Sequence, residues 1–225
     1  MRVQAAYNCD TCRDRQFVII PDGGNGTAKP CHCRRIEPET LLEAMGVPSA
    51  YRVVWPAASF DPWPTSHMDY DVSRWTAAKT DPRLILLTGN LQTGKSTRAV
   101  ELCRRAINAG NCRSVAWLTP TQLEREERTS SLGYSRPLFS KARQAQITVI
   151  DNFGVDQMTI IGKTVLRELV DDRYSSDKPL IITTGLPFSS AQKEEYGAPT
   201  SIQEYSPELA ARMLRGLVLR VRKTF

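Results

Sequence analysis

Short apolar runs recur through the second half of the chain and are separated by segments with helical spacing. The first run is Leu84-Ile85-Leu86-Leu87-Thr88, and further strands are predicted at 114–118, 146–150, 180–184 and 217–221. Helices are predicted in the intervals at 96–109, 164–174 and 207–214. Because short buried strands that alternate with helices are typical of a parallel sheet covered on both faces, the pattern predicts an α/β fold.

The first 82 residues follow a different pattern. A short β-type run at 17–20 precedes a turn-rich stretch at 21–26, and a short helix is predicted at 37–46, with Pro38 in its first turn and Gly46 at its end. From Tyr51 to Pro82 the chain is rich in proline and aromatic residues, and prolines prevent a long helix there. The pattern predicts an N-terminal domain at 1–50, a linker at 51–82 and the α/β domain at 83–225.

Composition narrows the class of protein only moderately. The chain has 225 residues, of which 41% are hydrophobic, and no apolar run approaches the roughly 18 residues that a membrane span needs. The first residues lack the apolar core of a signal peptide, so we expect a soluble, cytoplasmic protein. The net charge of +6 weakly favours a nucleic-acid partner. The basic segment from Arg212 to Phe225 fits either phosphate contacts or a solvated edge.

A complete P-loop pattern follows the first predicted strand and opens the next helix. Glycines in such a loop let backbone N–H groups close around phosphate oxygens, and the helix N-terminus adds a favourable dipole. Lys95 is expected to reach the β- and γ-phosphates of ATP, and Ser96 to ligate Mg²⁺. The residues predicted to bind the nucleotide are Gly89, Asn90, Leu91, Gln92, Thr93, Gly94, Lys95, Ser96 and Thr97.

Two later strands end in polar residues that suit the same site. Asp151 ends a hydrophobic strand and is predicted to hold the magnesium, and capping of the strand is the alternative. Asn152 stands where related ATPases often have a second acid; because an amide cannot accept a proton, hydrolysis is predicted to be slow. Thr184 is the candidate for sensing the γ-phosphate, and a strand terminus without nucleotide contact is the alternative.

Four of the six cysteines lie within the first 33 residues. The spacing is Cys9-x-x-Cys12, then Cys31-His32-Cys33, which predicts a structural zinc ion held by four thiolates. His32 could replace one thiolate, and unliganded thiols or a redox pair are the alternatives. Cys103 and Cys112 lack such partners, and Cys103 is predicted to lie in the core.

Together these motifs resemble the AAA+ helicase-loader family of bacteria and their phages, the DnaC/DnaI type, which is related to the IstB transposition ATPases. The resemblance covers nearly the whole chain: the cysteine knuckle precedes Gly46-Val47-Pro48-Ser49-Ala50-Tyr51-Arg52 and Phe60-Asp61, and the P-loop, the Ile150-Asp151 strand end, the Ile182-Thr183-Thr184 strand and the Ala211-Arg212-Met213-Leu214 helix follow in the family order. It implies a lidless AAA+ core at 83–225 behind an N-terminal zinc knuckle.

The resemblance also implies a function. The protein would oligomerise with ATP at subunit interfaces, bind single-stranded DNA and deliver the replicative helicase during DNA replication. Arg212 would act as an arginine finger on a neighbouring subunit's ATP, whereas the residues alone favour a surface arginine. Arg136, Lys141 and Arg143 would contact DNA, or else form a solvated helix face.

Three positions depart from the family pattern. Asn152 replaces an acid, Gly185 stands where an asparagine often serves as a sensor, and Arg215 follows Arg212 by three positions where four are expected. Two alternative functions therefore stay open: an IstB-like transposition ATPase, and a zinc-containing DNA adaptor that binds ATP but hydrolyses little of it.

Overall fold

A computed structural model of the protein describes residues 17–21, 26–30, 37–52, 70–130, 135–154, 159–196, 200–213 and 215–221. The chain divides into two compact units, Met1–Glu37 and Pro38–Phe225. Among the described residues, no helix combines the length and the apolar character that crossing a membrane requires.

The N-terminal unit contains an antiparallel hairpin. Strand β1 (Phe17–Ile20) pairs with β2 (Thr27–Pro30), and the register sets Phe17 opposite Pro30. This confirms the short β-type run at 17–20. The four cysteines predicted to bind zinc lie outside the described residues, so the zinc knuckle stays a prediction.

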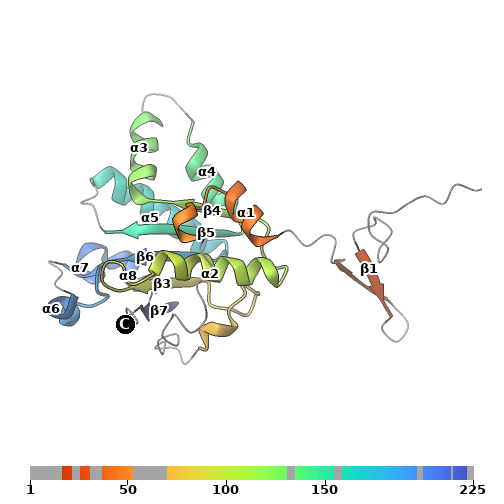
Figure 1. Ribbon diagram of the computed structural model, residues 1–225. Helices are drawn as coiled ribbons and strands as arrows, with labels where there is room; N and C mark the ends of the chain where they lie inside the picture. The colour runs from red at the N-terminus through yellow and green to blue at the C-terminus, as the bar shows by residue number, and fades with distance from the viewer. Residues whose placement is uncertain are drawn as a thin grey trace, which may run out of the picture. The chain divides into compact units, whose positions relative to one another are not determined.

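The second unit is built on a five-stranded parallel sheet, which confirms the predicted α/β class (Figure 1). Its strand order is β4-β5-β6-β3-β7. The strands are β3 (Leu84–Thr88), β4 (Val115–Leu118), β5 (Ile147–Phe153), β6 (Leu180–Thr184) and β7 (Leu217–Arg220). The P-loop strand β3 therefore lies between β6 and β7, both of which come much later in the sequence.

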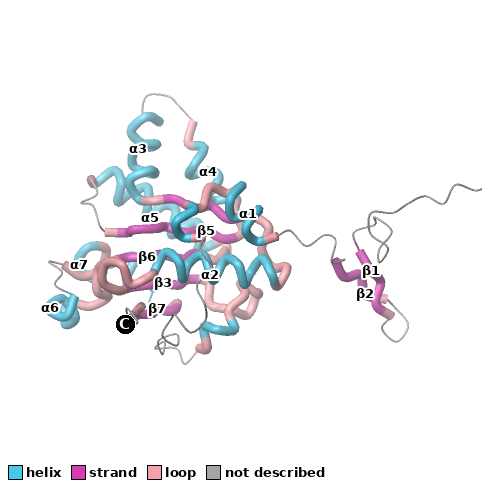
Figure 2. The backbone as a smooth tube through the Cα atoms, in the orientation of Figure 1, coloured by secondary structure: helices cyan, strands magenta, loops and turns pink. Residues whose placement is uncertain are grey.

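Helices cover both faces of this sheet (Figure 2). The α-helices are α1 (Pro38–Ala44), α2 (Lys95–Asn108), α3 (Pro120–Ser130), α4 (Pro137–Gln144), α5 (Ile160–Ser175), α6 (Lys193–Tyr196), α7 (Ile202–Tyr205) and α8 (Pro207–Met213). Short 3-10 turns lie at η2 (Ser49–Tyr51), η4 (Val72–Arg74) and η5 (Ser190–Gln192).

The two faces have separate apolar cores because side chains alternate along each strand. Ile85 and Leu87 point to the face covered by α1 and α2, which we call the α2 face. Leu84 and Leu86 point to the face covered by α3, α4, α5, α7 and α8, which we call the α5 face. Each polar residue at a strand end is therefore assigned to one face by its position in this alternation.

Helix α1 belongs to the larger unit rather than to the N-terminal one. The N-terminal domain was predicted at 1–50, whereas the contacts divide the chain after Glu37. Leu41 and Leu42 are buried in the core of the α2 face, and Glu39 pairs with Arg104 of α2. A helix this short needs a neighbouring surface to bury its apolar side, and α2 supplies it.

A fully buried arginine joins α5 to α4 and to the residues that precede β5 and β6. Arg173 donates hydrogen bonds to the carbonyl oxygens of Ala142, Ala145, Gln146 and Pro179. Burial lowers its pKa to about 10, so the side chain stays protonated at neutral pH. The sequence analysis did not single this residue out, because nothing in the local pattern distinguishes it from a surface arginine.

Candidate nucleotide site

The P-loop adopts the backbone that its glycines allow. Gly94 caps α2 in the left-handed region at φ 85°, and Gln92 lies there at φ 60°. At Gly89 a Cβ atom would come within 2.3 Å of the Val221 carbonyl oxygen, just past the end of β7. Only glycine fits at that position, because a side chain would collide with backbone.

Lys95 is folded back into the loop. It is 8% exposed, and its Nζ donates a hydrogen bond of 2.6 Å to the Asn90 carbonyl oxygen. Burial lowers the pKa of Lys95 to about 8, against the opposing effect of the Asp151 carboxylate. A phosphate at the N-terminus of α2 would give this ammonium a stronger acceptor than a carbonyl.

Asp151 is the centre of a small polar cluster on the α2 face. Its Oδ1 accepts a hydrogen bond of 2.7 Å from Ser96 Oγ and one of 2.6 Å from Thr183 Oγ1. Asp151 is 2% exposed. A hydroxyl and a carboxylate side by side are the hard oxygen donors that Mg²⁺ prefers, so Ser96 and Asp151 suit the magnesium ion predicted from the sequence.

A β-bulge explains the backbone at Asn152. Ile150 pairs with Ile182 and Phe153 with Thr184, so β5 carries one more residue than β6 across this interval. Asn152 lies in the left-handed region at φ 61°, its side chain is exposed, and its N–H donates to Thr183 Oγ1 at 3.0 Å. Asparagine adopts this conformation more readily than most residues, which gives it a structural reason to stand here.

The structure brings Thr183, rather than the predicted Thr184, to Asp151. Thr184 lies on the α5 face, fully buried, where its hydroxyl donates to the Phe153 carbonyl oxygen at 2.7 Å and accepts from the Leu186 N–H at 3.0 Å. The strand was predicted at the observed position. Neighbouring residues of a strand point to opposite faces, so the two hydroxyls lie on different sides of the sheet, and the sensing role of Thr184 stays a prediction.

Arg212 lies on α8, away from the P-loop helix. Its Nε donates to Asp171 Oδ1 on α5, and its guanidinium carbon lies 4.9 Å from the centre of the Tyr174 ring. Leu209 and Met213 of the same helix are buried in the core of the α5 face, whereas α2 covers the opposite face. The sheet therefore lies between α8, which carries Arg212, and the P-loop helix α2.

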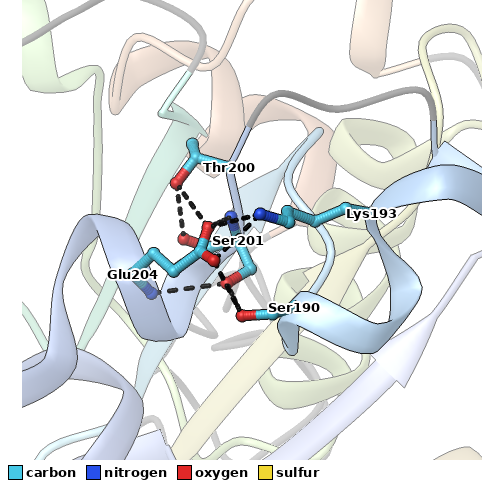
Figure 3. A network of polar contacts seen from close by, with 5 residues as sticks. All are labelled: Ser190, Lys193, Thr200, Ser201 and Glu204. Carbon is cyan, nitrogen blue, oxygen red and sulfur yellow. Dashed lines mark hydrogen bonds and ion pairs between the residues drawn. The ribbon is translucent and has the colours of Figure 1, made fainter.

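The segment that leads into α8 is fastened by one carboxylate (Figure 3). Glu204 accepts hydrogen bonds from Ser190 Oγ at 2.9 Å, Lys193 Nζ at 2.9 Å, Thr200 Oγ1 at 3.2 Å and the Ser201 N–H at 3.1 Å. The Lys193 ammonium, followed by the other donors, lowers the pKa of Glu204 to about 2. This network joins η5 and α6 to the start of α7.

The three residues predicted to contact DNA all have partners within the chain. Arg136 pairs with Glu127 and Glu168 and stacks on the Phe139 ring, Arg143 pairs with Asp172, and Lys141 donates to the Met45 carbonyl oxygen. Their DNA contacts stay a prediction, and a DNA phosphate would have to compete with these carboxylates.

Cys103 and Cys112 are buried, as predicted for Cys103, and burial raises the pKa of both thiols.

Within the described residues, no three histidine, cysteine, aspartate or glutamate side chains are grouped so that they could hold a metal ion. No protein-family model matches the chain, and no curated protein matches it. Solved structures do match. The crystal structure of the DnaC helicase loader aligns with a TM-score of 0.52 and 14% identity, over 67% of this chain and 84% of that one. The chain therefore has an AAA+ fold like that of the DnaC helicase loader.

Two structures of the replication initiator DnaA share this AAA+ fold. DnaA bound to AMPPCP and single-stranded DNA aligns with a TM-score of 0.54 and 10% identity, over 78% of this chain but only 51% of DnaA. Domain III of DnaA from Thermotoga maritima aligns with a TM-score of 0.52 and 17% identity, over 77% of this chain and 65% of that one. At these identities the likeness establishes the AAA+ fold alone.

Proposed function

We propose that this chain is an ATP-dependent helicase loader, which assembles with ATP, binds single-stranded DNA and delivers the replicative helicase during DNA replication. The observation that carries the proposal is the cluster of Ser96, Asp151 and Thr183 beside a complete P-loop, in a fold shared with the DnaC helicase loader. The DnaA structure that holds AMPPCP and single-stranded DNA supports both ligands as candidates.

The nucleotide is held by this chain's own groups in the proposal. The N–H groups of the loop and of the first turn of α2 bind the phosphates, and Lys95 exchanges the Asn90 carbonyl for phosphate oxygens. Magnesium, when bound, neutralises phosphate charge and is held by Ser96 and Asp151. Thr183 fixes the carboxylate of Asp151 and the backbone of Asn152 at once.

Lys95→Ala tests the nucleotide site. The variant should lose ATP binding or turnover while keeping its circular dichroism and melting temperature, with Lys79→Ala, at an exposed position, as the matched control. Wild-type affinity and turnover in Lys95→Ala would contradict the site. Helicase delivery is tested separately, by whether a hexameric helicase is retained when the protein is isolated from its host with ATP present.

The position of Arg212 supports action in trans. It lies on the face opposite its own P-loop helix, and in the proposal it completes a neighbour's site, so Arg212→Ala should spare ATP binding and lower turnover. Mixing Arg212→Ala with Lys95→Ala chains should restore some activity at hybrid interfaces. Mixtures that stay inactive at every ratio, with both variants folded, would count against this arrangement.

Zinc is part of the proposal for the N-terminal unit. The β1–β2 register pairs Phe17 with Pro30, so the two ends of the hairpin lie side by side. Cys9 and Cys12 precede the hairpin and Cys31 and Cys33 follow it, which suits one tetrahedral ion. Elemental analysis of freshly purified protein should give one zinc per chain, and a value well below one would contradict this assignment.

A second candidate function rests on Asn152. Without a carboxylate at this position, a zinc-containing adaptor that holds ATP and barely hydrolyses it is the alternative. Turnover measured with and without single-stranded DNA separates the two: a loader should respond to DNA or to its helicase, and the adaptor should not. An IstB-like transposition ATPase would instead retain a transposase.

A further inference from the structure

Arg212 is held by two groups of helix α5 at once. The Asp171 carboxylate accepts a hydrogen bond from Nε, and the ring of Tyr174 lies 4.9 Å from the guanidinium carbon. Among the described residues, the terminal amines Nη1 and Nη2 form no hydrogen bond, and the side chain is 34% exposed. The inner nitrogen of the guanidinium is thus fixed, while its outer edge is left for another acceptor.

Tyr174 is itself held in place. Its hydroxyl accepts a hydrogen bond of 2.7 Å from Arg215 Nη1, and its ring packs against the core of the α5 face. Arg215 follows α8 directly, where its N–H bonds the Arg212 carbonyl oxygen at 3.0 Å. The end of α8 is therefore joined to α5 twice, through Arg212 and through Arg215.

We propose that Asp171 and Tyr174 are positioning residues, which hold the Arg212 guanidinium so that its two terminal amines face the phosphate of ATP bound to a second copy of this chain. The inference rests on the proposed function and adds the groups that prepare Arg212 before the subunits meet. A long arginine side chain loses rotational freedom when it is fixed in one geometry. Fixing it within the subunit removes that cost from the assembly step.

The electrostatics of the arrangement are compatible with this role. A carboxylate on Nε leaves the planar fork of Nη1 and Nη2 available for the paired contact that a phosphate accepts. The Asp171–Arg212 pair is partly exposed, with side chains 43% and 34% accessible, so water screens the neutralising effect of the carboxylate. Arg212 can therefore keep Asp171 and still attract a phosphate.

The neighbouring Asp172 provides a matched control. It lies on the same helix, one residue further on, and its carboxylate pairs with Arg143 rather than Arg212. Asp171→Ala should lower ATP turnover of the assembled full-length protein by about tenfold, the order of effect that a misplaced catalytic group produces. Its ATP affinity should equal that of the wild type, and Asp172→Ala should match the wild type in both measurements.

Two further variants and a mixing experiment separate positioning from a merely structural role. Asp171→Asn keeps an oxygen that accepts from Nε and should recover part of the lost turnover. Asp171→Ala combined with Arg212→Ala should be no slower than Arg212→Ala alone. Asp171→Ala chains should regain activity when mixed with Lys95→Ala chains, which supply an intact Arg212, and should gain none when mixed with Arg212→Ala chains.

The outcomes distinguish this inference from the proposed function. If Arg212→Ala itself leaves turnover and assembly unchanged, the proposal that Arg212 acts on a neighbouring subunit is contradicted. If Arg212→Ala is slow but Asp171→Ala behaves like Asp172→Ala, the positioning role is overturned and the proposed function stands. An increase of turnover in Asp171→Ala would also overturn it, because the carboxylate would then be restraining Arg212 rather than presenting it.

Discussion

At the scale of single residues, the buried ammonium of Lys95 links nucleotide binding to pH. Burial lowers its pKa to about 8, so the side chain loses its proton as the pH rises through that value. A bound phosphate favours the charged form and should draw a proton back onto Nζ. ATP binding above pH 8 therefore includes the uptake of a proton.

The expected result is that ATP affinity falls as the pH rises from 7.5 to 9.5, by up to about tenfold per pH unit above 8. Lys95→Arg should remove the dependence, because a guanidinium stays protonated over this range. Isothermal titration calorimetry in two buffers of different ionisation enthalpy measures the proton uptake directly. A pH-independent affinity in the wild type would contradict this linkage.

The backbone at Asn152 decides which acidic residue can replace it. Glutamate would place a longer side chain in the left-handed region, at a cost of about 1 kcal/mol. Asn152→Asp adds a carboxylate in a residue that tolerates this backbone. We expect Asn152→Asp to raise ATP turnover about tenfold at unchanged affinity, a small share of the usual general-base effect.

Asn152→Gly is the matched control, since glycine accepts the same backbone and carries neither amide nor carboxylate. Its melting temperature and turnover should equal those of the wild type if the asparagine serves the bulge alone. A fast wild-type enzyme that gains nothing from Asn152→Asp would show that the base lies elsewhere.

At the scale of elements, the Glu204 network is the feature with a measurable contribution to stability (Figure 3). The pKa of the Glu204 carboxyl group is about 2 in the folded chain, below the ordinary value of 4.5 that applies to the unfolded chain. The unfolded chain therefore binds more protons between these values, and the contribution is fully present above pH 4.5 and is lost as the pH falls toward 2.

Glu204→Gln should lower the melting temperature at pH 7, and the difference from the wild type should shrink as the pH is reduced from 5 to 3.5. Glu194→Gln, at an exposed position of the neighbouring helix α6, is the control and should change little. A difference for Glu204→Gln that does not depend on pH would mean that the carboxylate charge is not what fastens this segment.

The elements themselves were largely predictable from the sequence, because burial imposes a period on each of them. The P-loop strand was predicted at 84–88 and observed there, and the helix predicted at 96–109 runs over Lys95–Asn108. The site was less predictable. Local pattern does not reveal a bulge, so neither the conformation of Asn152 nor the choice of Thr183 over Thr184 could be derived. The carboxylate partners of Arg136 and Arg143 come from other helices, which sequence spacing does not show.

At the scale of the whole molecule, the division after Glu37 separates the proposed zinc ion from the nucleotide site. All the residues that build the P-loop, the magnesium cluster and Arg212 belong to the larger unit. A structural zinc contributes folding free energy to the unit that binds it. Its loss should therefore affect the N-terminal unit first.

Removal of the metal with a chelator should release one zinc per chain and leave ATP affinity unchanged. Hydrogen exchange should increase in residues 17–30 and stay constant in residues 84–108, which contain the P-loop. Treatment of a Cys9→Ser variant, which should hold no zinc, gives the control. Loss of ATP binding together with the metal in the wild type would show that the two units depend on each other.

The position of β3 also has a consequence for folding during synthesis on the ribosome. Ile85 pairs with Ile181 on one side and with Leu217 on the other, and Gly89 rests against Val221. Both neighbours of the P-loop strand are synthesised long after it. The nascent chain therefore contains the P-loop sequence long before the P-loop can fold, and ATP can stabilise the fold only after β7 has been made.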